Sequence, residues 1–119
     1  MEKVQHLLVV EAVVDQEAAL AAAVGRALLE HEPQLDELAA SGQRAKIYTC
    51  GPDAMMAAVA RLCEARGVLC EASLETPMAC GYGVCLGCPI PKRSGGYLYA
   101  CTEGPCVDAS SIAWKEAAR

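Results

Sequence analysis

Four cysteines in the second half of the chain have a spacing that is typical of an iron-sulfur site. Three of them form a C-x4-C-x2-C pattern, and the fourth follows after twelve intervening residues. Plant-type [2Fe-2S] proteins use this spacing, with three thiolates in one loop and a fourth from a distant segment. The pattern therefore predicts a cofactor that moves single electrons, with the ligands Cys80, Cys85, Cys88 and Cys101.

Three glycines lie among these cysteines and suit a loop that wraps tightly around a cluster. Gly81, Gly83 and Gly87 can adopt positive φ, and they carry no Cβ that would keep the backbone away from sulfur. Peptide N–H groups can then point at thiolate and sulfide, where they tune the reduction potential.

Other uses of the cysteines fit less well. A structural zinc site favours two short C-x2-C knuckles, and only Cys85 and Cys88 form one. The same pair lacks the strand and helix that flank a thioredoxin-like dithiol. Residues 1–14 show no basic region or small-residue cleavage site of a secretory signal, so we expect a reducing cytoplasm rather than disulfides.

The fourth ligand has two candidates, because Cys101 and Cys106 repeat the x4 spacing. Cys101 ends a strand-like run at residues 96–100, which a hairpin would return to the loop. Cys106 follows Gly104-Pro105, which leads the chain away. We therefore prefer Cys101, and we expect buried free thiols at Cys63, Cys70 and Cys106.

Length and charge limit the class of protein. The chain has 119 residues, 54% of them hydrophobic, and a formal net charge of −5. A negative charge argues against binding to nucleic acid or to an anionic membrane surface, and no apolar run is long enough to span a membrane. We expect partners that are proteins.

The first half of the chain alternates between strand and helix patterns. A β-branched run at Val4–Val14 predicts a buried strand, and Asp15 can cap a helix that continues to His31. We expect a second helix to begin at Pro33 and to end at Ser41-Gly42.

The pattern continues with a strand at Ala45–Thr49 and a helix in which Pro52 takes the first helical position. Gly67 ends this helix, and Val68–Leu74 alternates as a half-buried strand. This βαβαβ order predicts a parallel sheet flanked by helices, with ligands at the carboxyl ends of the strands.

A change in composition near Thr76 divides the chain into a domain at residues 1–75 and a domain at residues 76–119. The second domain is predicted to be β-rich, with hairpin arms at Pro89–Lys92 and Tyr97–Cys101. A short final helix that carries Trp114 is predicted to be capped by Asp108.

Four motifs together resemble a known family. They are Tyr48-Thr49-Cys50-Gly51-Pro52-Asp53-Ala54-Met55-Met56, Glu71-Ala72-Ser73-Leu74-Glu75, Met78-Ala79-Cys80-Gly81 and Cys85-Leu86-Gly87-Cys88-Pro89. In this combination the C-terminal portion, from Ile47 to Trp114, resembles the electron-transfer (iron-sulfur and FAD) subunit of bacterial dihydroorotate dehydrogenase, in the ferredoxin-reductase superfamily.

The resemblance implies a fold and a pathway. The fold would be α/β, with a partial parallel, ferredoxin-reductase-like nucleotide-binding sheet followed by a small β-rich [2Fe-2S] domain. In the family, a partner subunit with FMN oxidises dihydroorotate to orotate in pyrimidine biosynthesis, and electrons pass through the cluster to FAD and then to NAD. The resemblance thus implies a cytoplasmic hetero-oligomer with an FMN-containing catalytic subunit or another flavoprotein.

The resemblance also implies site residues. Cys80, Cys85, Cys88 and Cys101 match the cluster ligands of the family. The turn Cys50-Gly51-Pro52 matches the motif that lies near the nicotinamide, where a helix start offers free N–H groups. No catalytic residue is expected, so the chain would not be catalytic alone.

The chain departs from the family in length, since it has less than half of the expected size and no flavin barrel. Residues 1–75 would be a truncated pyridine-nucleotide domain, and FAD would bind only with a missing or partner-supplied domain. Two alternatives remain open: a zinc-binding interaction domain, and the small subunit of another flavin and iron-sulfur NAD(P) oxidoreductase. In the bifurcating enzymes of that second type an aspartate replaces one cysteine ligand, so four cysteines favour the dihydroorotate type.

Overall fold

The computed structural model describes residues 6–11, 30–42 and 44–114. The first predicted helix, at residues 16–31, therefore lies almost entirely outside the described residues. Within the described part of the chain, no helix has the length and apolar character needed to cross a membrane.

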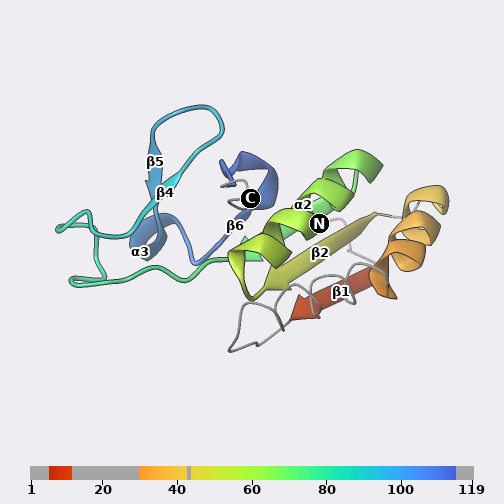
Figure 1. Ribbon diagram of the computed structural model, residues 1–119, viewed down its shortest axis with the longest axis horizontal. Helices are drawn as coiled ribbons and strands as arrows, with labels where there is room; N and C mark the ends of the chain where they lie inside the picture. The colour runs from red at the N-terminus through yellow and green to blue at the C-terminus, as the bar shows by residue number, and fades with distance from the viewer. Residues whose placement is uncertain (1–5, 12–29, 43, 115–119) are drawn as a thin grey trace.

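The described residues form a mixed α/β fold around a four-stranded sheet (Figure 1). The strand order is β1-β2-β3-β6, with β1 parallel to β2 and β2 parallel to β3. The predicted parallel sheet is therefore confirmed in these three strands. The fourth strand comes from the C-terminal part of the chain and pairs antiparallel with β3. The bounds are β1 His6–Glu11, β2 Ala45–Cys50, β3 Leu69–Ser73 and β6 Cys106–Asp108.

Helix α2 (Asp53–Arg66) connects β2 to β3 and covers one face of the sheet. Its C-cap is Gly67, in the left-handed conformation with φ 67°, as the sequence predicted. Pro52 was predicted to be the first helical residue but is the N-cap, with an extended ψ of 141°. The reason is that its carbonyl already accepts the N–H groups of Met55 and Met56, so Pro52 contributes an acceptor just outside the first turn.

A second helical segment comprises residues 30–40. The prediction that Pro33 begins this helix is wrong, because residues 30–32 are already helical. Leu35 faces the core and is 2% exposed. Arg66 of α2 contacts Asp36 at 2.5 Å, which ties the two helices together.

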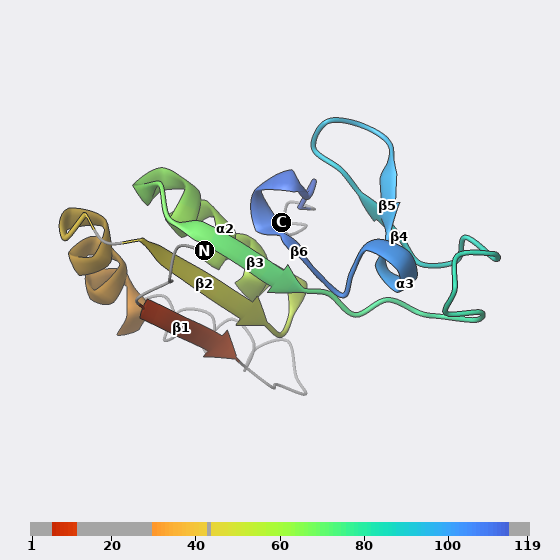
Figure 2. The same ribbon diagram turned by 180° about the vertical axis from the view of Figure 1, so that it is seen from behind.

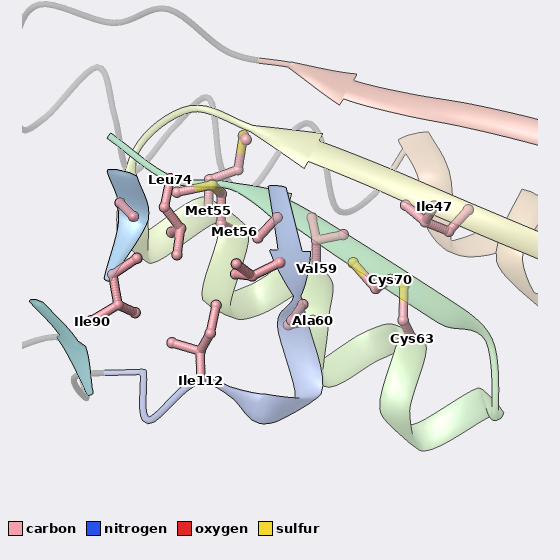
Figure 3. Close-up of a cluster of buried hydrophobic side chains, with 14 of the residues drawn as sticks. Ile47, Met55, Met56, Val59, Ala60, Cys63, Cys70, Leu74, Ile90 and Ile112 are labelled. Atoms are coloured by element: carbon pink, nitrogen blue, oxygen red, sulfur yellow. The ribbon is translucent and has the colours of Figure 1, made fainter. Parts of the chain in front are cut away.

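The core lies between α2 and the sheet and continues under the C-terminal segment (Figure 3). Alternate residues of β2 and β3 are buried, and this explains why the period-two pattern at Val68–Leu74 located β3. Apolar side chains from the predicted second domain join the same cluster, so the core is continuous. Its members include Ile47, Met55, Met56, Val59, Ala60, Cys63, Cys70, Ala72, Leu74, Ile90, Leu98 and Ile112.

The C-terminal segment contains the predicted hairpin, formed by β4 (Pro89–Pro91) and β5 (Tyr97–Tyr99), which pair antiparallel. The second arm ends earlier than predicted, because residues from Ala100 to Glu103 form the short helix α3. Cys101 therefore lies in α3 and not on the strand. The turn of this helix is closed by a hydrogen bond from Gly104 N to the Ala100 carbonyl.

After β6 the chain forms a 3-10 turn, η1 (Ala109–Ser111), and Asp108 caps it as predicted, since its carboxylate accepts from Ser110 N at 2.9 Å. Trp114 was predicted on this helix but lies beyond it. Its indole Nε1 donates to the Ala109 carbonyl at 2.9 Å, so it packs back over the turn.

Candidate metal centre

The predicted cluster loop, residues 75–88, extends away from the end of β3 and returns to the hairpin (Figures 1 and 2). It carries three of the four predicted ligands, and Cys101 enters from α3. Cys88 is 3% exposed where the loop meets the core, whereas Cys85 is exposed at the outer part of the loop.

Backbone N–H groups of the loop point at the sulfur atoms. The Tyr82 and Cys85 N–H groups donate to Cys80 Sγ at 3.5 and 3.4 Å. The Gly87 N–H donates to Cys85 Sγ at 3.4 Å. Such bonds favour the charged form of sulfur, which is the form that binds metal.

The pKa of Cys80 shows this effect. Hydrogen bonds from the N–H groups of Cys85 and Tyr82 lower the pKa of the Cys80 thiol to about 6. A neighbouring Cys85 side chain adds a smaller lowering contribution. Cys80 is therefore prepared to act as a thiolate near neutral pH.

The third and fourth cysteines form a second pair. Hydrogen bonding to the Cys88 side chain raises the pKa of the Cys101 thiol, and burial and the charge of Cys88 raise it further. The Gly83 N–H also bonds to Cys101 and acts in the opposite direction. The fold thus brings Cys101 to the loop, although through a helical turn and not through the predicted strand.

The cysteines influence one another across the loop: the Cys85 side chain lowers the pKa of Cys80, and Cys88 and, more weakly, Cys80 raise the pKa of Cys101. Among the described residues, no three Cys, His, Asp or Glu side chains converge on one point in the way that a single metal ion requires. A tetrahedral zinc site needs four ligands around one ion, whereas a two-iron cluster takes two thiolates on each iron. The iron-sulfur prediction therefore rests on the spacing of the four cysteines and on the N–H groups aimed at sulfur.

The backbone conformation explains why glycine occurs at two of the three predicted positions in the loop. Gly81 and Gly83 have φ of 74° and 88°, and a Cβ on Gly83 would lie 2.8 Å from Thr102 Cγ2. Gly87 does not have a positive φ, contrary to the prediction. It is needed for close approach, since its Cβ would lie 3.3 Å from Cys85 Sγ. The sequence did not indicate that Leu86 would have a positive φ, of 56°.

Cys106 was predicted to be a buried free thiol, and this is wrong. It is exposed, because it occupies an outward position at the start of β6, opposite Ser73 of β3. Its place in the main sheet agrees with the prediction that the chain leads away from the loop after Gly104-Pro105. Cys63 and Cys70 are buried, as predicted.

The cluster loop also has an apolar surface that the ligand motif did not predict. No charged residue occurs between residues 76 and 91. Four large apolar side chains of the loop are at least half exposed. They form what we term the loop collar: Met78 (50%), Tyr82 (70%), Val84 (68%) and Leu86 (55%).

Polar contacts hold the hairpin against α2. The guanidinium of Arg93 donates to both carboxylate oxygens of Glu64, at 2.6 and 3.1 Å. The Arg93 backbone N–H donates to the Ser111 carbonyl, and Ala113 N donates to the Pro91 carbonyl. These contacts fix the hairpin that carries Cys88 and leads into Cys101.

The predicted nucleotide turn lies at the carboxyl end of β2. Gly51 has φ 145°, which favours glycine. Beside the turn, Thr49 is 1% exposed, and within the described part of the chain its Oγ1 has no hydrogen-bond partner. The turn thus combines an unpaired hydroxyl with the unpaired N–H groups that begin any helix.

A depression of about 170 Å³ lies between this turn and the hairpin. Asp53 and Trp114 line it together with Thr76, whose Oγ1 is buried and has no partner among the described residues. The depression thus lies between Asp53, the first residue of α2, and Pro89–Pro91 of β4, and Pro89 follows Cys88 in the chain.

Comparison with known proteins identifies relatives of the cysteine-rich part. Residues 75–113 match the family model described as the iron-sulfur cluster binding domain of dihydroorotate dehydrogenase B. This match confirms the prediction of an iron-sulfur cofactor for the C-terminal segment.

Curated relatives carry the same description. The chain is 46% identical over 66 residues to the electron transfer subunit of dihydroorotate dehydrogenase B (NAD(+)) from Clostridium acetobutylicum, which covers 56% of this chain and 26% of that protein. It is 41% identical over 69 residues to the same subunit from Caldanaerobacter subterraneus, covering 56% and 28%. The chain thus spans about a quarter of the length of the relatives that it matches.

A solved structure is also similar. It is that of an NADH-dependent reduced ferredoxin-NADP oxidoreductase, reported for flavin-based electron bifurcation, with a TM-score of 0.58 and 26% identity. The match covers 71% of this chain and 30% of that chain. Together these relatives confirm, for the C-terminal portion of the chain, the resemblance to the electron-transfer subunit of dihydroorotate dehydrogenase B.

Proposed function

We propose that the chain is an electron-transfer component of an oxidoreductase and that it binds one [2Fe-2S] cluster through Cys80, Cys85, Cys88 and Cys101. The observation that carries this proposal is the loop whose backbone N–H groups donate to Cys80 Sγ and Cys85 Sγ, with the Cys88 and Cys101 side chains in contact beside it. When bound, such a cluster accepts and donates single electrons. The loop supplies the thiolates and the N–H donors that tune its potential.

In this proposal the two domains bind different cofactors. Residues 76–119 form the small β-rich cluster-binding domain, and residues 1–75 form a truncated pyridine-nucleotide-binding domain. The turn Cys50-Gly51-Pro52 would contact the nicotinamide of NAD, and the unpaired Thr49 hydroxyl supports a polar ligand there.

FAD would bind only with a barrel from a missing or partner-supplied domain. The depression lined by Asp53 and Pro89 supports a flavin ring at this place, because Asp53 follows the nucleotide turn and Pro89 follows Cys88 in the chain. The unpartnered Thr76 Oγ1 offers one polar contact to such a ring. The described residues otherwise form only one side of the site.

The proposed partner is the FMN-containing catalytic subunit of dihydroorotate dehydrogenase, in a cytoplasmic hetero-oligomer. The uncharged and exposed loop collar supports a protein partner, because a solvated loop would be expected to carry charge. The chain would then carry electrons from dihydroorotate oxidation toward NAD. All eight cysteines are free, which suits a reducing compartment.

One other function is favoured by a specific observation. The similarity to the ferredoxin-NADP oxidoreductase fold makes the small subunit of such an enzyme the second candidate. The presence of cysteine at all four ligand positions favours the dihydroorotate type.

The test is reduction of the chain in a defined complex. The chain is purified without oxygen together with the FMN-bearing subunit, and dihydroorotate is added while visible absorption is followed. The proposal expects bleaching that a Cys88→Ser variant abolishes and a Cys106→Ser variant retains. Bleaching by NADPH with a ferredoxin-type partner, and none with dihydroorotate, would instead select the second candidate.

A further inference from the structure

A second pair of cysteines lies outside the cluster loop and joins α2 to β3. Cys63 is in the last turns of α2 and Cys70 is the second residue of β3. The two side chains lie side by side in the core (Figure 3). They are 1% and 8% exposed, and six residues separate them in the chain.

The two thiols interact directly. The Cys70 thiol donates a hydrogen bond to Cys63, which lowers the pKa of Cys63 and raises the pKa of Cys70. The positive charge of Arg66, one helical turn after Cys63, lowers the pKa of Cys63 further. The hydrogen bond thus makes the two thiols unequal, with Cys63 the more acidic and Cys70 the proton donor, which is the asymmetry that thiol oxidation needs.

The pair is reached through a surface depression of about 240 Å³. Both cysteines line it, together with the Gly67-Val68 turn and Asp108. A molecule as small as hydrogen peroxide can therefore approach the sulfur atoms although the side chains are nearly buried. A large disulfide reagent would meet more obstruction.

We propose that Cys63 and Cys70 form a reversible, redox-active dithiol that is separate from the cluster ligands and that is oxidised to a disulfide by small peroxides. The Cys63 thiolate attacks one peroxide oxygen, the O–O bond breaks, and a sulfenic acid forms on Cys63. The Cys70 sulfur then attacks Cys63, its proton goes to the leaving hydroxide, and water departs. Overall, two thiols and one hydrogen peroxide give one disulfide and two waters.

The fold favours this product over other disulfides. The pair is fixed by the last turn of α2 and the short connection through Gly67, so closing the bond requires no long-range rearrangement. The cluster loop extends from the opposite end of β3, where Ser73 is the last residue. The bond would fasten the C-terminal end of α2 to the sheet.

The test uses the full chain purified without oxygen with its cluster. It is treated with one equivalent of hydrogen peroxide, free thiols are alkylated, and the chain is denatured and digested with trypsin and a glutamate-specific protease. Cleavage at Arg61 and Glu64 isolates Cys63, and cleavage at Arg66 and Glu71 isolates Cys70, apart from every cluster cysteine. The joined pair of peptides is then quantified by mass spectrometry.

We expect the joined peptides to increase at least tenfold over the untreated chain and to separate again with dithiothreitol. Cys106, which is exposed, serves as the internal control and remains available for alkylation. In a Cys63→Ala variant, Cys70 should stay unpaired. Recovery of both cysteines as separate alkylated peptides, or equal pairing of Cys70 with a cluster cysteine, would overturn the proposal.

Discussion

In the sheet and α2, the side chains of Ile47, Met55 and Met56 are at most 1% exposed, whereas Tyr82, Val84 and Leu86 of the cluster loop are 55 to 70% exposed. Both regions contain cysteine, but its surroundings differ. Cys63 and Cys70 pack among apolar side chains, and the loop thiols accept hydrogen bonds from backbone N–H groups.

The contrast shows that different interactions determine the conformation of the two regions. Around α2, burial of apolar surface determines the packing, so the helix should form whether or not metal is bound. The loop has few buried side chains, and its backbone has positive φ at Gly81, Gly83 and Leu86. Its order must therefore come largely from bonds to sulfur and to the metal that the sulfur binds.

The largest expected effect is a loss of iron on substitution of a predicted cluster cysteine, with no such loss on substitution of a buried cysteine of α2. Cys88→Ser should abolish cluster binding, because it removes a ligand at the point where the loop meets the core. Iron and acid-labile sulfide per chain should fall from about two of each to near zero. The matched control, Cys63→Ser, should retain both, and equal loss in the two variants would contradict the contrast.

Shortening a side chain in the core should lower the stability of the fold but should not change how much iron the folded chain binds. Ile47 is fully buried, so Ile47→Ala should lower the free energy of unfolding by about 2 to 5 kcal/mol. Chemical denaturation followed by circular dichroism measures this loss. Chains that remain folded should still bind iron in full, and a loss of iron from the folded fraction would show that the two regions are more tightly coupled.

Backbone substitution in the loop should have a smaller effect. Gly83→Ala introduces a Cβ at φ 88° and 2.8 Å from Thr102 Cγ2, with an expected cost of about 1 to 3 kcal/mol. The measurement is the rate at which visible absorption is lost in the presence of an iron chelator, and this loss should be faster in the Gly83→Ala variant. Gly95→Ala is the control for φ alone, since no atom lies within 4 Å of its Cβ. Addition of Thr102→Ser should restore part of the lifetime in the Gly83 variant, and an unchanged lifetime would exclude the clash.

The smallest effect concerns the ion pair between α2 and Arg93, which lies in the hairpin that follows the cluster loop. Arg93 lowers the pKa of Glu64, so this contact stabilises the folded state above the ordinary carboxylate pKa and is lost as pH falls through the lowered value. Glu64→Gln should lower the melting temperature slightly at neutral pH and low salt. The difference from wild type should shrink with added salt and with acid, whereas Glu37→Gln, at an exposed carboxylate outside this contact, should show no such dependence.

Sequence patterns predicted the sheet region well because the spacing of apolar residues along a strand or helix reflects which side chains are buried. The strand β3 followed from alternation, and the end of α2 followed from a glycine C-cap at Gly67. The error at Pro33 arose because residues 30–32 are helical as well, and the sequence does not distinguish a proline at the first helical position from one that follows other helical residues.

The conformation of the loop was harder to predict. The spacing identified the cysteines, but it did not predict the positive φ of Leu86 or the position of Cys101 in α3. Both depend on contacts that a local sequence pattern does not show. Cys106 was misplaced because its strand pairs with β3, a partner more than 30 residues away in the chain. The exposed loop collar likewise became evident only once the loop was seen to project from the sheet.

The proposed function depends on a two-iron cluster held by Cys80, Cys85, Cys88 and Cys101. Metal and sulfide analysis of the chain purified without oxygen tests this directly, with zinc measured in the same sample. We expect about two iron atoms and two acid-labile sulfides per chain, with visible absorption that bleaches on reduction. Stoichiometric zinc without acid-labile sulfide would contradict it.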